Sequence, residues 1–127
     1  MKRIKITIEY DGTRYSGWQK QPNELTIQGE IEKAIENSIG EKVEVFGSGR
    51  TDAGVHALGQ TAHFDLVSPV PTEKLAMILN NALPDDIVVK DAVEVDENFH
   101  ARFSIKKKCY QYRTFHNSVN EEPVVVV

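Results

Sequence analysis

The segment Lys2–Tyr10, with the sequence KRIKITIEY, indicates how the chain begins to fold. Its apolar residues, Ile4, Ile6, Ile8 and Tyr10, alternate with polar ones. Because side chains of a β-strand point alternately to its two faces, this period of two residues predicts a half-buried strand. The alternation is also not that of a secretion signal, which needs a continuous apolar stretch.

Two segments downstream have the apolar spacing of amphipathic helices. Thr26 precedes the first as a candidate N-cap, and Gly40 stands at its C-terminal end. Thr72 is the candidate N-cap of the second, and Pro84 closes it. The predicted buried stripes recur every three or four residues, as a helix face requires; they are Ile27, Ile31, Ala34, Ile35 and Ile39 in the first helix, and Leu75, Ile78, Leu79 and Ala82 in the second.

Further strands are predicted at residues 43–46, 61–67, 87–95 and 109–115. The order of elements is therefore β-α-β-β-α-β followed by an additional strand. This order predicts an α+β, ferredoxin-like fold: an antiparallel sheet with both helices on one face. The other face is expected to stay open, which suits RNA binding but also many other functions, so the fold alone does not decide function.

Composition limits the class of protein. The chain has 127 residues, 40% of them hydrophobic and 27% charged, which is typical of one ordinary globular domain. No apolar run approaches the roughly 20 residues that span a bilayer. A single cysteine, Cys109, excludes an internal disulfide and a multi-cysteine metal site, which favours the cytoplasm.

Charge gives a mixed indication about nucleic acid. The formal net charge of −4 argues against such a partner. Residues 102–113, however, contain no acidic residue, and this run is either a solvated face or a strip that follows phosphates. Its basic residues are Arg102, Lys106, Lys107, Lys108 and Arg113.

The C-terminus is an apolar run, Val124–Val127. Four exposed valines would form a sticky edge, whereas native ends are usually polar. We therefore expect the chain to stop inside a strand of a longer protein.

The stretch with the greatest chemical content is residues 47–57, GSGRTDAGVHA. It is longer than a simple turn between strands and carries polar groups that can converge on one point. The residues alone leave three interpretations open. The stretch is a phosphate-binding loop, although it has no GK[ST] ending; a metal site at Asp52 and His56, although further ligands are missing; or a structural loop in which Arg50 and Asp52 form an ordinary ion pair.

The segment GRTDAGVHA at residues 49–57 resembles the signature of the TruA family of tRNA pseudouridine synthases. Similar motifs follow in the family's order over essentially the whole chain: residues 9–19 (EYDGTRYSGWQ), 26–28 (TIQ), 59–60 (GQ), 63–64 (HF), 80–84 (NNALP), 99–104 (FHARFS) and 108–113 (KCYQYR). Family members are about twice as long, so the resemblance implies that residues 1–127 are the N-terminal catalytic domain and that a C-terminal domain is missing.

The resemblance implies isomerisation of uridine to pseudouridine in the tRNA anticodon stem-loop, at positions 38–40. That reaction needs no cofactor and no metal. Asp52 is implied as the catalytic carboxylate, with Arg50 keeping it ionised and Tyr110 stacking on the base or removing a proton. Candidate RNA-binding residues are Arg14, Trp18 and Gln19 in the first loop, Tyr110, and the basic strip. Trp18 is equally consistent with packing of the loop, and the histidines are expected to be structural.

The family also works as a homodimer on tRNA, which would gather the basic strips of two acidic subunits into one cleft. Two other classes of function remain as alternatives. A non-catalytic ferredoxin-like RNA-binding module would bind RNA without Asp52, but the chain lacks the aromatic motif of RNA-recognition domains. A small-molecule enzyme or an oligomeric structural protein on the same fold would not bind RNA.

Overall fold

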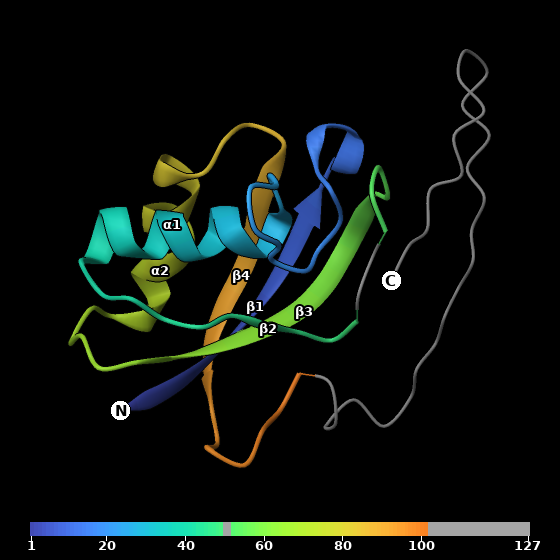
Figure 1. Ribbon diagram of the computed structural model, residues 1–127. Helices are drawn as coiled ribbons and strands as arrows, with labels where there is room; N and C mark the ends of the chain where they lie inside the picture. Colours follow the sequence, from blue (N-terminus) through green and yellow to red (C-terminus); the bar gives the residue numbers. More distant parts are fainter. Residues whose placement is uncertain (50–51, 102–127) are drawn as a thin grey trace.

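The computed structural model describes residues 1–49 and 52–101. Its strands form a four-stranded antiparallel sheet in the order β2-β3-β1-β4 (Figure 1). The predicted ferredoxin-like α+β arrangement is confirmed, while the expected strand at 109–115 lies outside the described residues. The elements are β1 (Lys2–Tyr10), a 3-10 turn (Gly12–Arg14), α1 (Ile27–Ile39), β2 (Phe46–Gly47), β3 (Ala57–Leu66), α2 (Thr72–Ala82) and β4 (Ile87–Val95).

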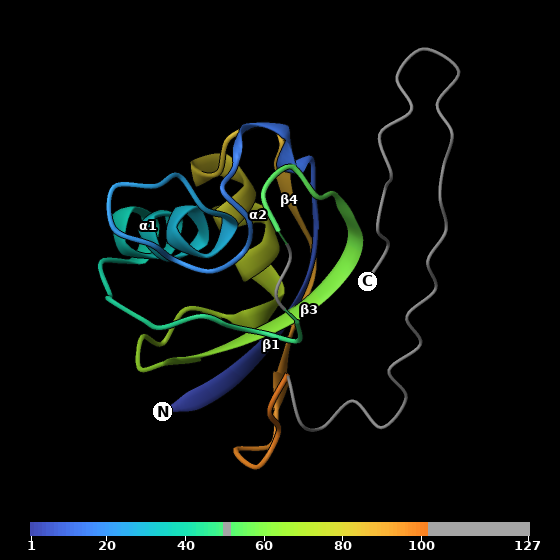
Figure 2. The same cartoon turned by 45° about the vertical axis from the view of Figure 1, so that its right-hand side comes forward.

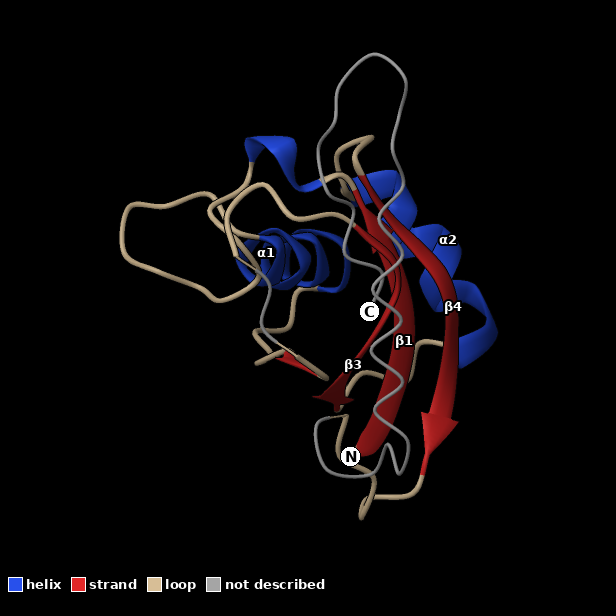
Figure 3. Cartoon of the chain, turned by 90° about the vertical axis from the view of Figure 1, so that its right-hand side faces the viewer, coloured by secondary structure: helices blue, strands red, loops and turns tan. Residues whose placement is uncertain are grey.

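Strand β1 lies at the centre of the sheet, as its alternation predicts. It pairs with β3 on one side and β4 on the other, and its four apolar side chains are buried beneath the helices. Both helices cover this one face of the sheet (Figure 2). Viewed from the side, β1 and β4 run in front of α2 (Figure 3). The core is continuous; its largest buried side chains include Phe64, Leu66, Ile31 and Leu79.

Helix α1 begins and ends where the sequence predicts. The Thr26 side chain accepts a hydrogen bond from the Gly29 N–H at 3.2 Å, and Gly40 follows the last turn with φ of 81°. The cap predicted for α2 is wrong, because Pro71 occupies the N-cap position and Thr72 is the first helical residue. Leu83, which is buried, replaces the exposed Ala82 as the last apolar contact of α2.

The strand predicted at 43–46 is shorter than expected, and β2 contains only Phe46 and Gly47. Two side chains of α1 explain the difference. The Val45 N–H donates to the Glu32 carboxylate at 3.1 Å, and the Val45 carbonyl oxygen accepts from the Gln28 amide at 3.0 Å. Because helix side chains satisfy this backbone, it needs no strand partner.

Strand β3 starts earlier than predicted, at Ala57, because Ala57 pairs with Tyr10 at the end of β1. The connection that carries Asp52 is therefore confined to residues 48–56.

The sheet face opposite the helices is partly covered, contrary to the expectation that it stays open. Phe99 and His100 lie against His63 there, and His63 is 1% exposed.

Candidate active site

The loop between β2 and β3 lies at the end of the sheet where β1 finishes, beside the first loop of the chain (Figure 1). Asp52 in this loop is exposed to solvent. Its carbonyl oxygen accepts a hydrogen bond from the Val55 N–H at 3.2 Å, which closes a turn directly after it. Arg50 lies outside the described residues. The loop therefore presents a carboxylate at its surface from a turned backbone.

Hydrogen bonds join the described part of the Asp52 loop to the first loop. The Gly54 N–H donates to the Tyr15 carbonyl oxygen at 3.2 Å, and the Gly12 N–H donates to Nδ1 of His56 at 2.9 Å. The two backbones also touch between these bonds. A Cβ atom added to Gly12 would lie 2.6 Å from the carbonyl carbon of Val55, so only glycine permits this approach.

The histidine prediction holds in this loop, because His56 has the structural role expected of it.

The first loop is in turn held by Asp86, which directly precedes β4. The Asp86 carboxylate accepts hydrogen bonds from the Arg14 guanidinium at 2.8 Å and from the Tyr15 hydroxyl at 2.6 Å. Its carbonyl oxygen accepts from the Asp11 N–H at 2.9 Å.

Electrostatics fix the protonation states of this contact. Burial acts to raise the pKa of Asp86, but the hydrogen bonds from Arg14 and Tyr15 outweigh it and hold that pKa below its ordinary value. Burial, followed by the hydrogen bond to Asp86, raises the pKa of the Tyr15 hydroxyl. Asp86 is therefore a carboxylate acceptor and Tyr15 a stable donor at neutral pH. The sequence predicts only a turn and a strand start at Asp85 and Asp86, and nothing in the pattern indicates these bonds.

The start of the Asp52 loop is anchored from inside the protein. Gln60 is fully buried, and its amide joins two groups. The oxygen accepts from the Tyr10 hydroxyl at 2.6 Å, while the nitrogen donates to the Gly49 carbonyl oxygen at 2.7 Å. A buried amide with both ends satisfied fixes its neighbours in one arrangement. Sequence reasoning missed this role, although Gln60 stands out as a polar residue on the apolar face of β3.

The three candidate RNA-binding residues of the first loop differ in their exposure to solvent. The side chain of Arg14 is 62% exposed while its guanidinium is held by Asp86. Gln19 is exposed. Trp18 is only 3% exposed and packs against Gly47, where an added Cβ would lie 2.6 Å from the indole. In this arrangement Trp18 is a packing residue with no surface for stacking on a base, as the alternative interpretation holds.

The remaining predicted site residues lie outside the described residues. They are Arg50, Arg102, Lys106, Lys107, Lys108, Tyr110 and Arg113.

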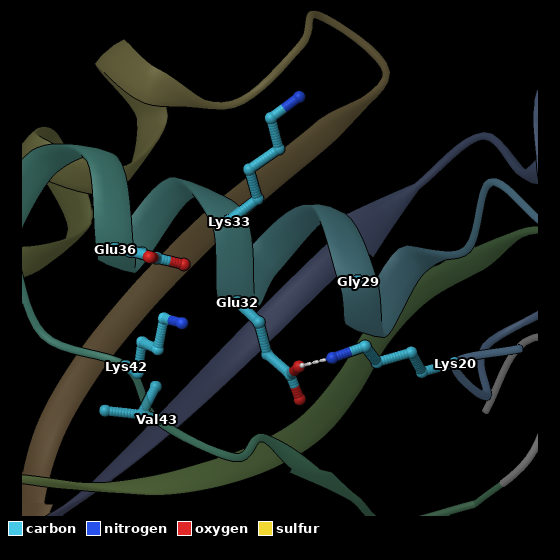
Figure 4. A pocket seen from close by; sticks show the side chains of 7 residues that line it. All are labelled: Lys20, Gly29, Glu32, Lys33, Glu36, Lys42 and Val43. Carbon is cyan, nitrogen blue, oxygen red and sulfur yellow. Dashed lines mark hydrogen bonds and ion pairs between the residues drawn. The ribbon is translucent and has the colours of Figure 1, made fainter. Parts of the chain in front are cut away.

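An open hollow lies away from the Asp52 loop, between α1 and the segment that follows it (Figure 4). Its charges are mixed: Lys20 forms an ion pair with Glu32 at 3.2 Å, and Lys42 lies on the side of Glu36. An adjoining hollow includes Gln19. Among the described residues, none of the Asp52 loop lines either hollow, although Gln19, a candidate RNA-binding residue, lines the second. Within residues 1–49 and 52–101, no group of histidine, cysteine and acidic residues is arranged to hold a metal ion.

His63 is structural, as expected. Its Nδ1 atom accepts a hydrogen bond from the buried Ala101 N–H at 3.0 Å, and its ring stacks on Phe46 with centroids 5.1 Å apart. Burial, assisted by the charges of His100 and Arg3, lowers the pKa of His63 to about 4. His63 is therefore neutral at physiological pH and supports the sheet.

Comparison with known proteins identifies the family to which this chain is similar. A family model described as tRNA pseudouridine synthase matches residues 6–104. A protein of Caldicellulosiruptor saccharolyticus named tRNA pseudouridine synthase A is 56% identical over 117 residues, which are 92% of this chain and 48% of the relative. The protein of the same name from Brevibacillus brevis is 53% identical over 119 residues, 94% of this chain and 49% of the relative.

The chain therefore belongs to the tRNA pseudouridine synthase family. A further relative named tRNA pseudouridine synthase A, from Acetivibrio thermocellus, is 51% identical over 117 residues, 92% of this chain and 48% of the relative. The chain spans about half the length of the curated relatives it matches. No helix in the part of the chain that the structure describes is long and apolar enough to cross a membrane.

Proposed function

We propose that this chain is the N-terminal catalytic domain of a tRNA pseudouridine synthase that converts uridine to pseudouridine in the anticodon stem-loop, at positions 38–40. Membership of the family and the names of its relatives support this function. The one structural observation that carries the proposal is the exposed Asp52 on a loop held by the first loop at Tyr15 and Gly12.

The reaction rearranges one base without net oxidation or hydrolysis. The bond from N1 of uracil to C1′ of the ribose breaks, and a bond from C5 to C1′ forms. The proton on C5 is lost to solvent, and N1 gains one, so atoms balance without a cofactor. A carboxylate serves this reaction by forming a covalent adduct or by stabilising charge at the sugar. We assign that role to Asp52, because a solvent-facing carboxylate on an anchored loop is accessible to a flipped base.

Arg50 and Tyr110 are proposed as the other catalytic residues. Arg50 would pair with Asp52 and occupy the vacated base stack or hold a phosphate. Tyr110 would stack on the target base or remove a proton. Arg14, Gln19 and the basic strip of residues 102–113 are proposed to contact the tRNA backbone. Support for these roles comes from the sequence motifs and from the exposure of Arg14 and Gln19.

The proposed partner is tRNA, bound by a cytoplasmic homodimer in which the C-terminal domain completes each site. Dimerisation would bring together basic strips from two chains whose formal net charge is −4 each over these residues. The resemblance in sequence supports the homodimer, and the share of the relatives' length that this chain leaves unmatched supports the additional domain.

The test uses the full-length protein and unmodified tRNA carrying tritium at C5 of uridine. Asp52→Asn should reduce tritium release by at least about 10³-fold while leaving the Kd for tRNA within about threefold of wild type, since charge at the reacting carbon is lost and the loop is kept. Asp85→Asn, which removes an exposed carboxylate just before β4, is the control and should retain activity. Wild-type release from Asp52→Asn would overturn the assignment. RNA binding without any release from the wild-type protein would favour the non-catalytic RNA-binding module.

A further inference from the structure

Asp86 connects the end of the sheet to the first loop through both its side chain and its backbone. Oδ2 accepts from the Arg14 guanidinium at 2.8 Å and Oδ1 accepts from the Tyr15 hydroxyl at 2.6 Å. Its carbonyl oxygen accepts from the Asp11 N–H at 2.9 Å. The side chain is 19% exposed, so these bonds are partly shielded from water. One aspartate therefore holds three residues of the first loop: Asp11 by its backbone, and Arg14 and Tyr15 by their side chains.

Tyr15 carries this connection onward to the candidate catalytic loop. Its ring is buried, with 4% of the residue exposed, and its carbonyl oxygen accepts the Gly54 N–H at 3.2 Å. Gly54 lies two residues after Asp52, inside the turn that the Val55 N–H closes onto the Asp52 carbonyl oxygen. Two hydrogen bonds and the body of Tyr15 thus link the carboxylate of Asp86 to the backbone that presents Asp52.

The charge of Asp86 suits this supporting role. Its carboxylate faces a guanidinium and a hydroxyl, both donors, and charge-assisted hydrogen bonds of this kind are the stronger and more directional ones. The neighbouring Asp85 is exposed and makes none of these contacts. Two adjacent aspartates therefore have different surroundings, which makes Asp85 a matched control.

We propose that Asp86 is a positioning residue for the reaction: it fixes Tyr15, and Tyr15 fixes the Gly54 turn so that Asp52 is presented in its reactive place. The inference rests on the proposed function, because it takes Asp52 to be the catalytic carboxylate. Asp86 itself touches only protein groups. Its loss should therefore reduce the rate of the chemical step, since misplacing a reacting group by about 1 Å costs up to about 10²-fold.

The experiment compares Asp86→Ala, Asp86→Asn, Tyr15→Phe and Asp85→Asn in the full-length protein by tritium release from tRNA. Asp86→Ala should lower kcat about 30-fold with KM within about twofold of wild type. Tyr15→Phe keeps the buried ring and removes only the hydroxyl, so it should lower kcat about tenfold. Asp86→Asn keeps an oxygen acceptor for Tyr15 and should recover part of the loss. Asp85→Asn should match wild type.

Two further readouts separate positioning from general destabilisation. Tyr15→Phe combined with Asp86→Ala should have the kcat of Asp86→Ala alone, because the two residues act through one bond. The Gly54 amide should exchange with solvent deuterium at least about tenfold faster in Tyr15→Phe than in Asp85→Asn, since its acceptor is no longer fixed. If Asp86→Ala fails to fold, Tyr15→Phe decides.

Failure of the two proposals is distinguishable. Activity in Asp52→Asn would overturn the proposed function, and the Gly54 exchange would still report whether Asp86 and Tyr15 hold the turn. If Asp52→Asn is inactive while Tyr15→Phe keeps the wild-type kcat and Gly54 protection, the positioning role is wrong. A rise in KM with unchanged kcat would also overturn it, since that pattern marks a residue that binds substrate.

Discussion

His56 and Gly12 join two loops that are 44 residues apart: Nδ1 of His56 accepts the Gly12 N–H at 2.9 Å. The same nitrogen lies 3.1 Å from Oδ1 of Asp11. Nδ1 cannot serve both groups at once. It accepts a hydrogen bond through its lone pair when it carries no proton, and it donates one when it carries a proton. The bond to Gly12 therefore belongs to the neutral form of the ring, and the contact with Asp11 is an ion pair only in the charged form.

Removing the His56 ring should weaken the contact between the two loops and lower the free energy of unfolding. His56→Ala leaves the buried Gly12 N–H without this acceptor, which costs about 1–3 kcal/mol. His56→Asn places an amide oxygen near the position of Nδ1 and should recover much of that loss. Urea unfolding of the 127-residue chain measures the difference, and exchange of the Gly12 amide locates it. Equal destabilisation by alanine and asparagine would show that the hydrogen bond does not matter.

Gly12 should tolerate no side chain. In Gly12→Ala the new Cβ would lie 2.6 Å from the carbonyl carbon and 3.0 Å from the nitrogen of Val55, and both are backbone atoms. The two loops would have to separate, at a cost of about 1–3 kcal/mol for an overpacked contact. In the full-length protein, tritium release should fall at the same time, because the Asp52 loop moves.

Gly59→Ala is the matched control for that substitution. Its added Cβ would meet only Thr7 Cγ2 at 3.8 Å, an ordinary contact, so unfolding and activity should stay close to wild type. Equal losses in both variants would mean that the effect of Gly12→Ala arises from alanine in general rather than from the contact with Val55.

Patterns that depend on periodicity were predictable from the sequence. The alternation of β1 and the helical stripe of α1 report directly which side chains face the core, so these elements are confirmed closely. The start of β2 was not predictable in this way. Whether the backbone at Val45 pairs with a strand depends on Gln28 and Glu32, which reach it from a different element. Periodicity contains no information on such long-range polar contacts.

The candidate site likewise has a part that the sequence predicts and a part that depends on long-range contacts. The residues 47–57 stand out by their glycines and charges, so the loop that carries Asp52 is visible in the sequence. Its supports are not. Asp86 looks like an ordinary turn residue, and its contact with Tyr15 spans 71 positions. Trp18 was ambiguous because an aromatic residue in a loop suits either stacking or packing, and only the close approach to Gly47 decides.

The buried pair of Tyr10 and Gln60 should behave as one unit in a double-mutant cycle. Tyr10→Phe removes the hydroxyl that donates to the Gln60 oxygen, leaving that buried oxygen without this partner at a cost of about 1–3 kcal/mol. Gln60→Leu removes the amide and also its bond to Gly49. The double variant should lose less than the sum of the two single losses, with a coupling of about 0.5–3 kcal/mol in urea unfolding. If the losses of unfolding free energy in the two single variants simply add in the double variant, Tyr10 and Gln60 do not act as one unit.

His63 should make the stability of the chain fall in mild acid. Its folded pKa of about 4 lies below the ordinary value of 6.5, so between these values the unfolded chain binds the proton that the folded chain excludes. Stability is therefore complete above about pH 6.5 and decreases as the pH falls towards 4, by about 3 kcal/mol at most. The cause is burial first and the nearby charges of His100 and Arg3 second.

His63→Asn tests this dependence, because its amide oxygen can accept the Ala101 N–H in place of Nδ1 and it does not titrate. The variant should be less stable at pH 7, where the ring's packing against Phe46 is lost, yet its stability should change little between pH 6.5 and 5. Asp65, whose pKa is lowered chiefly by the hydrogen bond from Arg3, loses its own contribution from about pH 5 downward, so the range from pH 6.5 to 5 isolates the effect of His63. Urea midpoints measured from pH 7 to pH 4 provide the comparison. A wild-type slope in His63→Asn would assign the acid sensitivity to another group.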